Sequence, residues 1–328
     1  MTAGGPAAAP AVLRLLRPDR RMAGPELARQ LGVSRAAVWK QVAALRAAGL
    51  EIDAGNGGYQ LLRRLDWLEP AAVLRSLPAG VRRRVGLVEN HWRVDSTSSE
   101  CLRRAAKLPD AAFVFADWQD AGRGRRGRRW VSPPATNLQF SCLKHFSGGY
   151  AALSGLSLAV GVAAAVALAD CGAAGVGLKW PNDLVHADAK LGGILIELGG
   201  EFMGPCFAVI GIGINLRLSP NARRALGRSC TDLAGVCGTA APTRNALAAA
   251  LVERLVDTLE TFDAAGFAGF ADAWAARDVL AGRAIRVEAA RGAFDAVADG
   301  VDARGALRVR TADGLRCLDS AEVSVRAQ

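Results

Sequence analysis

The chain has 328 residues and 51% of them are hydrophobic, enough to bury a sizeable core in about two or three domains. Its 41 basic residues exceed the 31 acidic ones, and the net charge of +10 indicates an anionic partner such as a nucleotide or a nucleic acid. The 7 cysteines form no C-x-x-C pair and the 3 histidines have no metal-ligand spacing, which argues against a zinc site or a disulfide framework.

The N-terminal residues 1–64 predict a winged helix-turn-helix domain. Residues 1–10 lack a basic start followed by an apolar run, so no signal peptide is expected. Pro25 is suited to the first turn of a helix that Gly32 ends, and Ser34 is suited to cap a second helix that extends to Ala48. A hairpin with a glycine-rich tip at residues 55–58 follows. Helix, short turn, helix and hairpin in this order are typical of that domain.

Residues 65–279 predict an α+β domain with a mixed sheet. Its strands are bunched instead of alternating regularly with helices, which argues against a doubly wound fold. Residues 151–169 are uncharged and roughly long enough to span a bilayer, but they are rich in Ala and Gly and have no basic flanks. We therefore expect a buried helix there, and a soluble cytoplasmic protein without a membrane segment. The expected strands are Phe113–Ala116, Leu138–Leu143, Gly193–Leu198 and Phe207–Ile212, and the expected helices are Ala152–Asp170 and Asn245–Phe262.

Residues 280–328 predict a small β-barrel domain. Short stretches with strand character alternate with turn pairs such as Asp313-Gly314. The expected strands are Ala284–Glu288, Phe294–Gly300, Ala306–Arg310, Leu315–Leu318 and Val323–Val325.

A run of glycine and arginine, AGRGRRGRRW at residues 121–130, is the most distinctive motif. Gly122 to Gly127 match G-x-G-x-x-G, but Pro133-Pro134 follow too closely for the helix that a dinucleotide site needs. Five arginines repel one another, and the glycines loosen the backbone. Such a loop is expected to order over a phosphate or a carboxylate. Taken alone, it would be better explained as a nucleic-acid-binding or solvated basic loop.

Three further motifs occur with this loop in one chain. KWPND at residues 179–183 places a cation, an amide and a carboxylate around a proline, and KLGGILIE begins at Lys190. Asn215 ends the small-residue stretch GIGIN, and Asp95-Ser96-Thr97 precedes a helix and offers hydroxyl groups. Each motif has a simple structural explanation, such as a helix cap or a surface turn. Their order and spacing together are specific.

In these motifs the chain resembles the bifunctional biotin–protein ligases that also repress the biotin operon, and the resemblance covers nearly its whole length. It implies a class II synthetase-like ligase domain and an SH3-like C-terminal barrel. It also implies that Ser96, Thr97 and Gln119 bind the biotin head group. Ser98 stands where the family commonly has Asn, so its contact with biotin is open. The loop residues Arg123, Gly124, Arg125 and Arg126 would contact biotin or the adenylate.

The same resemblance assigns the nucleotide end of the site. Lys190 would bind at the carboxyl–phosphate junction, with Lys179 also in the adenylate site, and Trp130 would order with the loop around adenine. Asn182 and Asn215 lie where Mg²⁺ and the phosphates of ATP are expected. The implied partners are the biotin acceptor domain of a carboxylase, operator DNA and, when the adenylate is bound, a second copy of the chain.

The chemistry of such a ligase suits these residue types. A carboxylate must attack the α-phosphate of ATP, so cations at the developing charge are the main need. Arg125, Lys190 and Mg²⁺ would supply them, and a closed loop would keep water from the mixed anhydride. In the second step a lysine of the acceptor attacks the acyl carbon. Asp183 is the candidate that orients or deprotonates this lysine.

The winged helix is expected to bind DNA through Ser34, Arg35 and Lys40. Ten basic residues against four acidic ones fall before residue 66, a net +6 (10 − 4) of the chain's +10. Three alternatives stay open: a ligase whose winged helix does not regulate transcription, a lipoate–protein ligase, and a regulator that senses biotin without catalysis.

Overall fold

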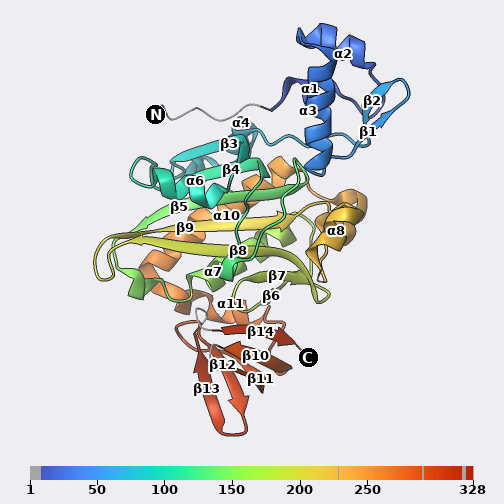
Figure 1. Cartoon of the computed structure of the whole chain (residues 1–328). Coiled ribbons are helices and arrows are strands. Elements are labelled where there is room, and N and C mark those ends of the chain that lie inside the picture. Colours follow the sequence, from blue (N-terminus) through green and yellow to red (C-terminus); the bar gives the residue numbers. More distant parts are fainter. Residues whose placement is uncertain (1–8, 228, 290–291, 320–322, 328) are drawn as a thin grey trace.

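The computed structural model describes residues 9–227, 229–289, 292–319 and 323–327. Three parts follow one another along the chain: a helical unit with a hairpin, a large sheet with helices on it, and a small sheet (Figure 1). Residues 1–8, which hold most of the segment considered for a signal peptide, lie outside the described residues.

The first part is the predicted winged helix-turn-helix, and its second helix agrees with the expected boundaries within one residue at each end. Ser34 caps that helix by accepting a hydrogen bond from the Ala37 backbone N–H at 3.1 Å. Gly32, with φ 64°, ends the preceding helix in the left-handed conformation. Val38, Val42 and Leu45 pack inward on one face of the second helix. The elements are α1 (Ala11–Leu15), α2 (Gly24–Leu31), α3 (Arg35–Ala47), β1 (Ile52–Gly55) and β2 (Gly58–Leu61).

The central part is a seven-stranded mixed sheet in the order β3-β4-β5-β9-β8-β7-β6. Only β3 and β4 are parallel; every other neighbouring pair is antiparallel, which confirms the predicted α+β class. The strands are β3 (Leu87–Val94), β4 (Ala112–Gln119), β5 (Asn137–Phe146), β6 (Gly177–Lys179), β7 (Asp183–His186), β8 (Ala189–Gly200) and β9 (Cys206–Asn215).

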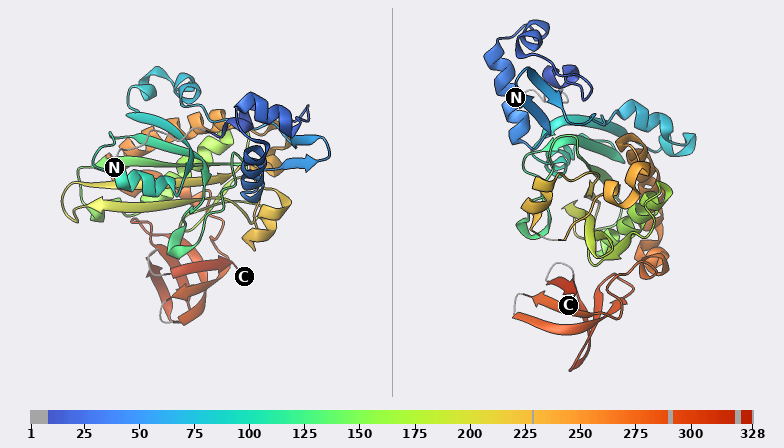
Figure 2. Two further views of the ribbon diagram at one scale, coloured as in Figure 1. Left: turned by 45° about the horizontal axis from the view of Figure 1, so that its top comes forward. Right: turned by 90° about the vertical axis from the view of Figure 1, so that its right-hand side faces the viewer.

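Helices cover the two faces of this sheet unequally. On one face, α7 and α10 pack over Phe113, Phe115 and Phe140 and form the main hydrophobic core (Figure 2). On the other face α6 covers only one corner, over Val114, Leu143 and Val209. The rest of that second face is left for the site described below. The helices are α4 (Pro70–Ser76), α5 (Ala79–Arg82), α6 (Thr97–Arg104), α7 (Leu156–Asp170), α8 (Pro220–Leu226), α9 (Leu233–Cys237), α10 (Arg244–Ala265) and α11 (Ala271–Ala275), with short 3₁₀ turns η1 (Arg125–Gly127), η2 (Tyr150–Leu153), η3 (Gly238–Ala240) and η4 (Gly266–Phe270).

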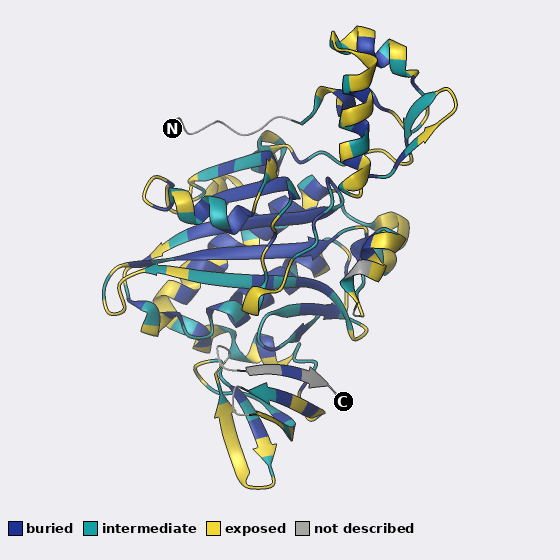
Figure 3. Ribbon diagram, in the orientation of Figure 1, coloured by how far each residue is buried: buried dark blue, intermediate teal, exposed yellow. Residues whose placement is uncertain are grey.

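The uncharged helix α7 is buried in the core, as expected from its composition (Figure 3). Its small residues let it lie close to both the sheet and α10, and Gly155, with φ 80°, starts it four residues later than predicted. Within the described residues, no helix is long and apolar enough to cross a membrane.

The C-terminal part differs from the predicted barrel. Its five strands form an open antiparallel sheet in the order β13-β12-β11-β10-β14, and no pairing of β13 with β14 closes it within the described residues. The edge strand β13 is mostly exposed: Leu318 packs against the main core, but Leu315 is 55% exposed, so β13 offers little apolar surface that would hold it against the opposite edge. The strands are β10 (Ala284–Ala289), β11 (Gly292–Val301), β12 (Leu307–Thr311), β13 (Gly314–Leu318) and β14 (Val323–Ala327).

The winged helix and the central sheet share buried contacts. Leu65, Trp92 and Ala135 belong to the same hydrophobic cluster as the core of the winged helix. A buried ion pair lies nearby, between Arg244 of α10 and Asp117 of β4. Arg244 also donates to the backbone oxygens of Asp66, at 3.0 Å, and of Asn137, at 3.1 Å. The segment that links the two parts is therefore attached to the sheet.

Candidate active site

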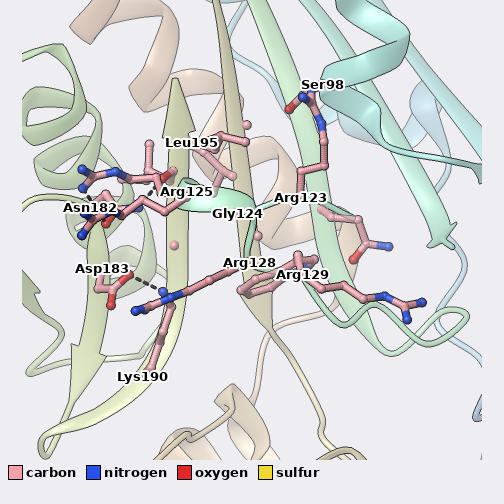
Figure 4. Close-up of a pocket in the computed structure, with 18 of the residues that line it drawn as sticks. Ser98, Arg123, Gly124, Arg125, Arg128, Arg129, Asn182, Asp183, Lys190 and Leu195 are labelled. Atoms are coloured by element: carbon pink, nitrogen blue, oxygen red, sulfur yellow. Dashed lines mark hydrogen bonds and ion pairs between the residues drawn. The ribbon is translucent and has the colours of Figure 1, made fainter. Parts of the chain in front are cut away.

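A polar cavity lies on the sheet face that α6 leaves uncovered. Its floor is formed by β5, β9 and β8, its ends by the start of α6 and by residues 179–183, and its roof by the glycine–arginine loop (Figure 4). Val325 of the C-terminal sheet also lines it. Four segments that are separate in sequence thus meet over one face of the sheet: the start of α6, the glycine–arginine loop, residues 179–183 and the C-terminal sheet.

The floor is hollow because small residues lie side by side on it. The pairing register places Gln139, Gly213 and Gly193 in one row across three strands, and Ser141, Gly211 and Leu195 in the next. A Cβ atom at residue 213 would lie 2.5 Å from the Trp130 ring, so only glycine lets that ring rest on the floor. The register therefore explains the GIGIN sequence: its alternate glycines face the cavity.

At one end, hydroxyl and amide groups form a connected set. Gln119 Oε1 accepts from the Thr97 backbone N–H at 2.7 Å and from Thr97 Oγ1 at 3.1 Å. The Ser141 hydroxyl lies 2.8 Å from Thr97 Oγ1 and 3.0 Å from Ser98 Oγ. Ser96 to Ser98 are buried at the start of α6, and Ser96 also lines the cavity. This end can bind the donors and acceptors of a small polar ligand.

At the other end, Lys190 is held in a defined position. Its ammonium group donates to Asp183 Oδ1, and both side chains are mostly buried. The register between β7 and β8 shifts beside Lys190, as in a β-bulge, which re-aims a side chain. The backbone of Lys190 is fixed as well: its N–H donates to Ser229 O at 3.2 Å, and its oxygen accepts from the Thr231 N–H at 2.9 Å. The cation is thus placed before any ligand binds.

The glycine–arginine loop folds back as a small hairpin. The Gly124 N–H donates to Arg128 O at 2.7 Å, and residues 125–127 form a 3₁₀ turn at its tip. Arg125 Nη1 lies 3.5 Å from Asn182 Oδ1, and Arg123 forms an ion pair with Glu197 at 2.6 Å. The loop is therefore attached to both β8 and the KWPND segment, and Arg125 points toward that segment (Figure 4).

Crowding of cations is the main electrostatic feature of the roof. Burial and the neighbouring charges of Arg126 and Arg128 lower the pKa of Arg125 below its ordinary value, although the Asp183 carboxylate opposes the shift. Arginine still carries its charge at any physiological pH. A bound anion would relieve both the desolvation and the repulsion, so the site favours a phosphate or a carboxylate.

Two buried polar atoms at the cavity have no hydrogen-bond partner within the described residues. They are Trp130 Nε1 and Gln139 Oε1. The other amide atom of Gln139 donates to Ala116 O at 2.7 Å, which orients the side chain. Because an unpaired buried polar group is costly, these atoms indicate that a polar ligand belongs in the cavity.

The structure brings together nearly all of the residues predicted for catalysis and ligand binding. Asn215 lies outside the cavity lining: its Nδ2 donates to Thr231 O at 3.1 Å, so it holds the backbone that follows α8. Ser34, Arg35 and Lys40 lie at the start and on α3 of the winged helix, as expected for residues assigned to DNA. The roles of all these residues remain predictions. Those that line the cavity are Ser96, Thr97, Ser98, Gln119, Arg123, Gly124, Arg125, Arg126, Trp130, Lys179, Asn182, Asp183 and Lys190.

Several lining residues were missed from the sequence. Arg128 and Arg129 belong to the loop motif and could have been included on that ground. Gln139 and Val325 carry no motif, because only the strand register and the fold of the C-terminal sheet bring them to the cavity. No local pattern marks residues of this second kind.

The donor set at the cavity suits a magnesium ion that arrives with a nucleotide. Within the described residues, no group of three or more His, Cys, Asp or Glu side chains is placed to hold a metal. Mg²⁺ usually keeps several waters and takes its other ligands from phosphates and one or two protein oxygens. Asn182 Oδ1 is an oxygen of the required kind on the cavity wall.

Comparison with known proteins agrees with this architecture. Family models match residues 11–60 as an HTH domain, residues 92–215 as the biotin/lipoate A/B protein ligase family, and residues 281–326 as the biotin protein ligase C-terminal domain. The bifunctional ligase/repressor BirA of Escherichia coli is 33% identical over 319 residues, 96% of each chain. The biotin–[acetyl-CoA-carboxylase] ligase of Paracoccus denitrificans is 35% identical over 238 residues, 70% of this chain and 97% of the relative.

Solved structures show the same fold. The biotin protein ligase of Aquifex aeolicus, solved in complex with biotin and ATP, superimposes with a TM-score of 0.63 at 24% identity, over 74% of this chain and 99% of that one. A winged helix-turn-helix, a mixed sheet with a glycine–arginine loop above a polar cavity, and a C-terminal sheet together define a ligase with a DNA-binding module. This chain belongs to the biotin protein ligase family, and the relatives that match nearly its full length include bifunctional ligase/repressors.

Proposed function

We propose that this chain joins biotin to a lysine of a carboxylase acceptor domain, with biotinyl-adenylate as the intermediate. The observation that carries this proposal is the cavity itself. It joins a hydroxyl- and amide-lined end, suited to the biotin head group, to an end where Lys190 and the arginine-rich loop converge. A carboxylate and a triphosphate would meet at that second end.

In the first step, an oxygen of the biotin carboxylate attacks the α-phosphorus of ATP, and the bond to the β-phosphate breaks to release pyrophosphate. Two anions must approach each other, so positioned cations lower the barrier. Lys190 is fixed by its backbone and by Asp183, and Arg125 reaches the same end of the cavity from the loop. Both charges act without the reorganisation that water would need. Mg²⁺ bound to the phosphates, with Asn182 near, would neutralise further charge.

In the second step, the amine of the acceptor lysine attacks the carbonyl carbon of the adenylate, an amide forms and AMP leaves. The attacking nitrogen must lose a proton. Asp183 is the carboxylate at this end of the cavity and is 26% exposed at its side chain, so it can meet an incoming amine. We assign it the role of orienting that amine and accepting its proton. The loop above the cavity would exclude water from the anhydride until then.

The first test separates biotin from lipoate. With ATP and Mg²⁺, biotin is expected to drive exchange of labelled pyrophosphate into ATP, whereas lipoate is expected to drive none above background. The reason is the polar end of the cavity at Ser96, Thr97 and Gln119, which offers hydrogen bonds that suit a ureido group and that a dithiolane ring does not use. Exchange with lipoate but not with biotin would refute biotin as the substrate and support lipoate in its place.

The winged helix supports a second activity, repression of transcription in response to biotin. Ser34 begins α3 at the position where such helices enter the major groove, and Arg35 and Lys40 are exposed on it. We propose that operator DNA binds there and that the adenylate strengthens binding by favouring a dimer, which would engage two half-sites. Titration of a palindromic duplex with the full-length chain tests this activity: binding should strengthen when biotin and ATP are both added, and binding that ignores the two ligands would refute the coupling.

We further propose that the dimer forms at the open edge of β8. The partner strand β7 pairs with β8 only as far as Gly193, so within the described residues no strand covers that edge from Ile194 to Gly200. Arg123 of the loop is bonded to Glu197 in this stretch. A ligand that orders the loop therefore acts directly beside the edge, which can pair with a second copy.

Sedimentation velocity is expected to show a shift toward dimer only when biotin and ATP are both present. Leu198→Asp, which adds a charge to the open edge where Leu198 is 39% exposed, is expected to weaken that shift by about tenfold or more in dimer affinity. Leu315→Asp on β13, where Leu315 is 55% exposed, serves as the matched control and should leave it unchanged. An equal effect of the two variants, or dimers that ignore both ligands, would contradict this interface.

A further inference from the structure

An exposed tryptophan stands on the helix assigned to DNA. Trp39 of α3 is 65% exposed, whereas Val38 and Val42 beside it are buried in the winged-helix core. Exposure of an indole to water has a free-energy cost of the size that drives its burial in a core. Trp39 does not pack into the winged-helix core, so we infer that a binding partner covers its side chain.

The surroundings of Trp39 leave room for a broad partner surface. Ala36 and Ala43, one turn away on either side, are small, so the indole projects beyond them. Trp39 lines a groove between α3, the start of α2 and the hairpin, where the backbone of Gly55 and Gly58 forms the opposite wall. The groove is thus open to a partner that contacts helix and hairpin together.

The charge of this face of α3 indicates which class of partner binds there. Helix α3 contains no acidic residue, and Arg35, Lys40 and Arg46 are all exposed on it. Within the described residues, the side chains of these three cations make no hydrogen bond or ion pair with the rest of the chain. Uncompensated cations on both sides of an exposed aromatic ring fit a duplex, whose phosphates flank each groove.

The chemistry of indole then limits what it can read. The major groove of DNA presents hydrogen-bond donors and acceptors and only one apolar feature, the C5-methyl group of thymine. Indole has a single N–H donor and an otherwise apolar edge and face. We propose that Trp39 reads a thymine methyl group in each half-site of the operator, and that it is a specificity-determining residue of this chain. This inference rests on the proposed binding of DNA by the winged helix.

The experiment is a selection from a pool of duplexes with a randomised centre, using the full-length chain with biotin and ATP. The wild-type chain is expected to enrich sequences with a fixed thymine in each half-site, and Trp39→Ala is expected to lose the preference at that position. The winning duplex is then made with deoxyuridine in place of that thymine, which removes only the methyl group. Affinity of the wild-type chain should fall about fourfold per half-site, the equivalent of ~0.8 kcal/mol for one buried methyl-sized group.

Controls distinguish the possible failures. Trp39→Ala should bind the two duplexes equally, while Trp39→Phe should keep part of the difference; both should melt as the wild type does, because the side chain is exposed. Arg35→Ala should weaken binding to every duplex and reduce its salt dependence. A wild-type chain that binds no duplex even at low salt would refute the DNA activity itself. A chain that binds DNA, but selects the same sequences and senses deoxyuridine equally with Trp39→Ala, would refute only the role of Trp39.

Discussion

Replacement of Lys190 by alanine is expected to slow formation of biotinyl-adenylate by about 10²–10³-fold, the range measured when one preorganised transition-state donor is removed elsewhere. The size of the effect follows from how firmly this cation is placed. Its backbone bonds to residues 229–231, and its ammonium group to Asp183, fix it before the substrates arrive. A cation that is already in position stabilises the transition state without any rearrangement of the site, at the point where the two anions meet. Single-turnover release of pyrophosphate measures this step directly.

The matched control is Lys107→Ala, which removes an exposed lysine in the turn that follows α6. It should leave the rate unchanged. Lys190→Arg adds a second test of position: the planar guanidinium cannot reproduce the point charge, so the rate should stay well below that of the wild type although the charge is kept. A Lys190→Ala enzyme as fast as Lys107→Ala would exclude Lys190 from the chemistry.

The sequence predicted which residues meet at one cavity where those residues lie in contiguous segments. The glycine–arginine loop, KWPND and the lysine of KLGGILIE each keep their functional atoms within one short segment. Recognition of those segments was therefore enough to place Arg125, Asn182, Asp183 and Lys190 at one cavity. The winged helix was predictable for a similar reason: caps such as Ser34 and Gly32 act over three or four residues.

Features that depend on register or on domain contacts were not predictable in this way. Gln139 faces the cavity because β5 pairs with β9 in one register, and a shift by one residue would turn it into the core. Asn215 ends the same strand as Gly213, yet it lies past the cavity and bonds to Thr231. Closure of the C-terminal barrel likewise depends on contacts between edge strands, which strand patterns in the sequence do not encode.

The buried ion pair between Asp117 and Arg244 could not be predicted from the sequence either, because no local pattern relates two residues so far apart in the chain. Both side chains are almost completely buried, at 4% and 1% exposure. Asn90 Nδ2 donates to Asp117 Oδ2 at 3.0 Å and also to Leu68 O at 3.1 Å. With the bonds of Arg244 to Asp66, this network holds the linker that follows the winged helix against the ligase sheet.

Arg244→Met is expected to destabilise the chain by about 3–5 kcal/mol, because it leaves the Asp117 carboxylate buried without its cation. Urea unfolding of the ligase domain measures the loss. The matched control lies on the same helix: Arg254 pairs with Asp170 at 2.8 Å, but both side chains are more than 40% exposed. Arg254→Met should therefore cost about 0–1 kcal/mol.

The double variant Arg244→Met with Asp117→Leu separates the charge from the rest of the network. Replacement of both partners removes the unpaired carboxylate, and a buried pair replaced by apolar residues is often close to neutral in stability. More than half of the lost free energy should therefore return. What does not return includes the lost hydrogen bonds of Arg244 to the linker and to Asn137 O, and that of Asn90 to Asp117. Hydrogen exchange at residues 66–69 of the linker should remain faster in the double variant than in the wild type. A double variant no more stable than Arg244→Met, or a single variant no worse than Arg254→Met, would mean that the buried charge is not what this network stabilises.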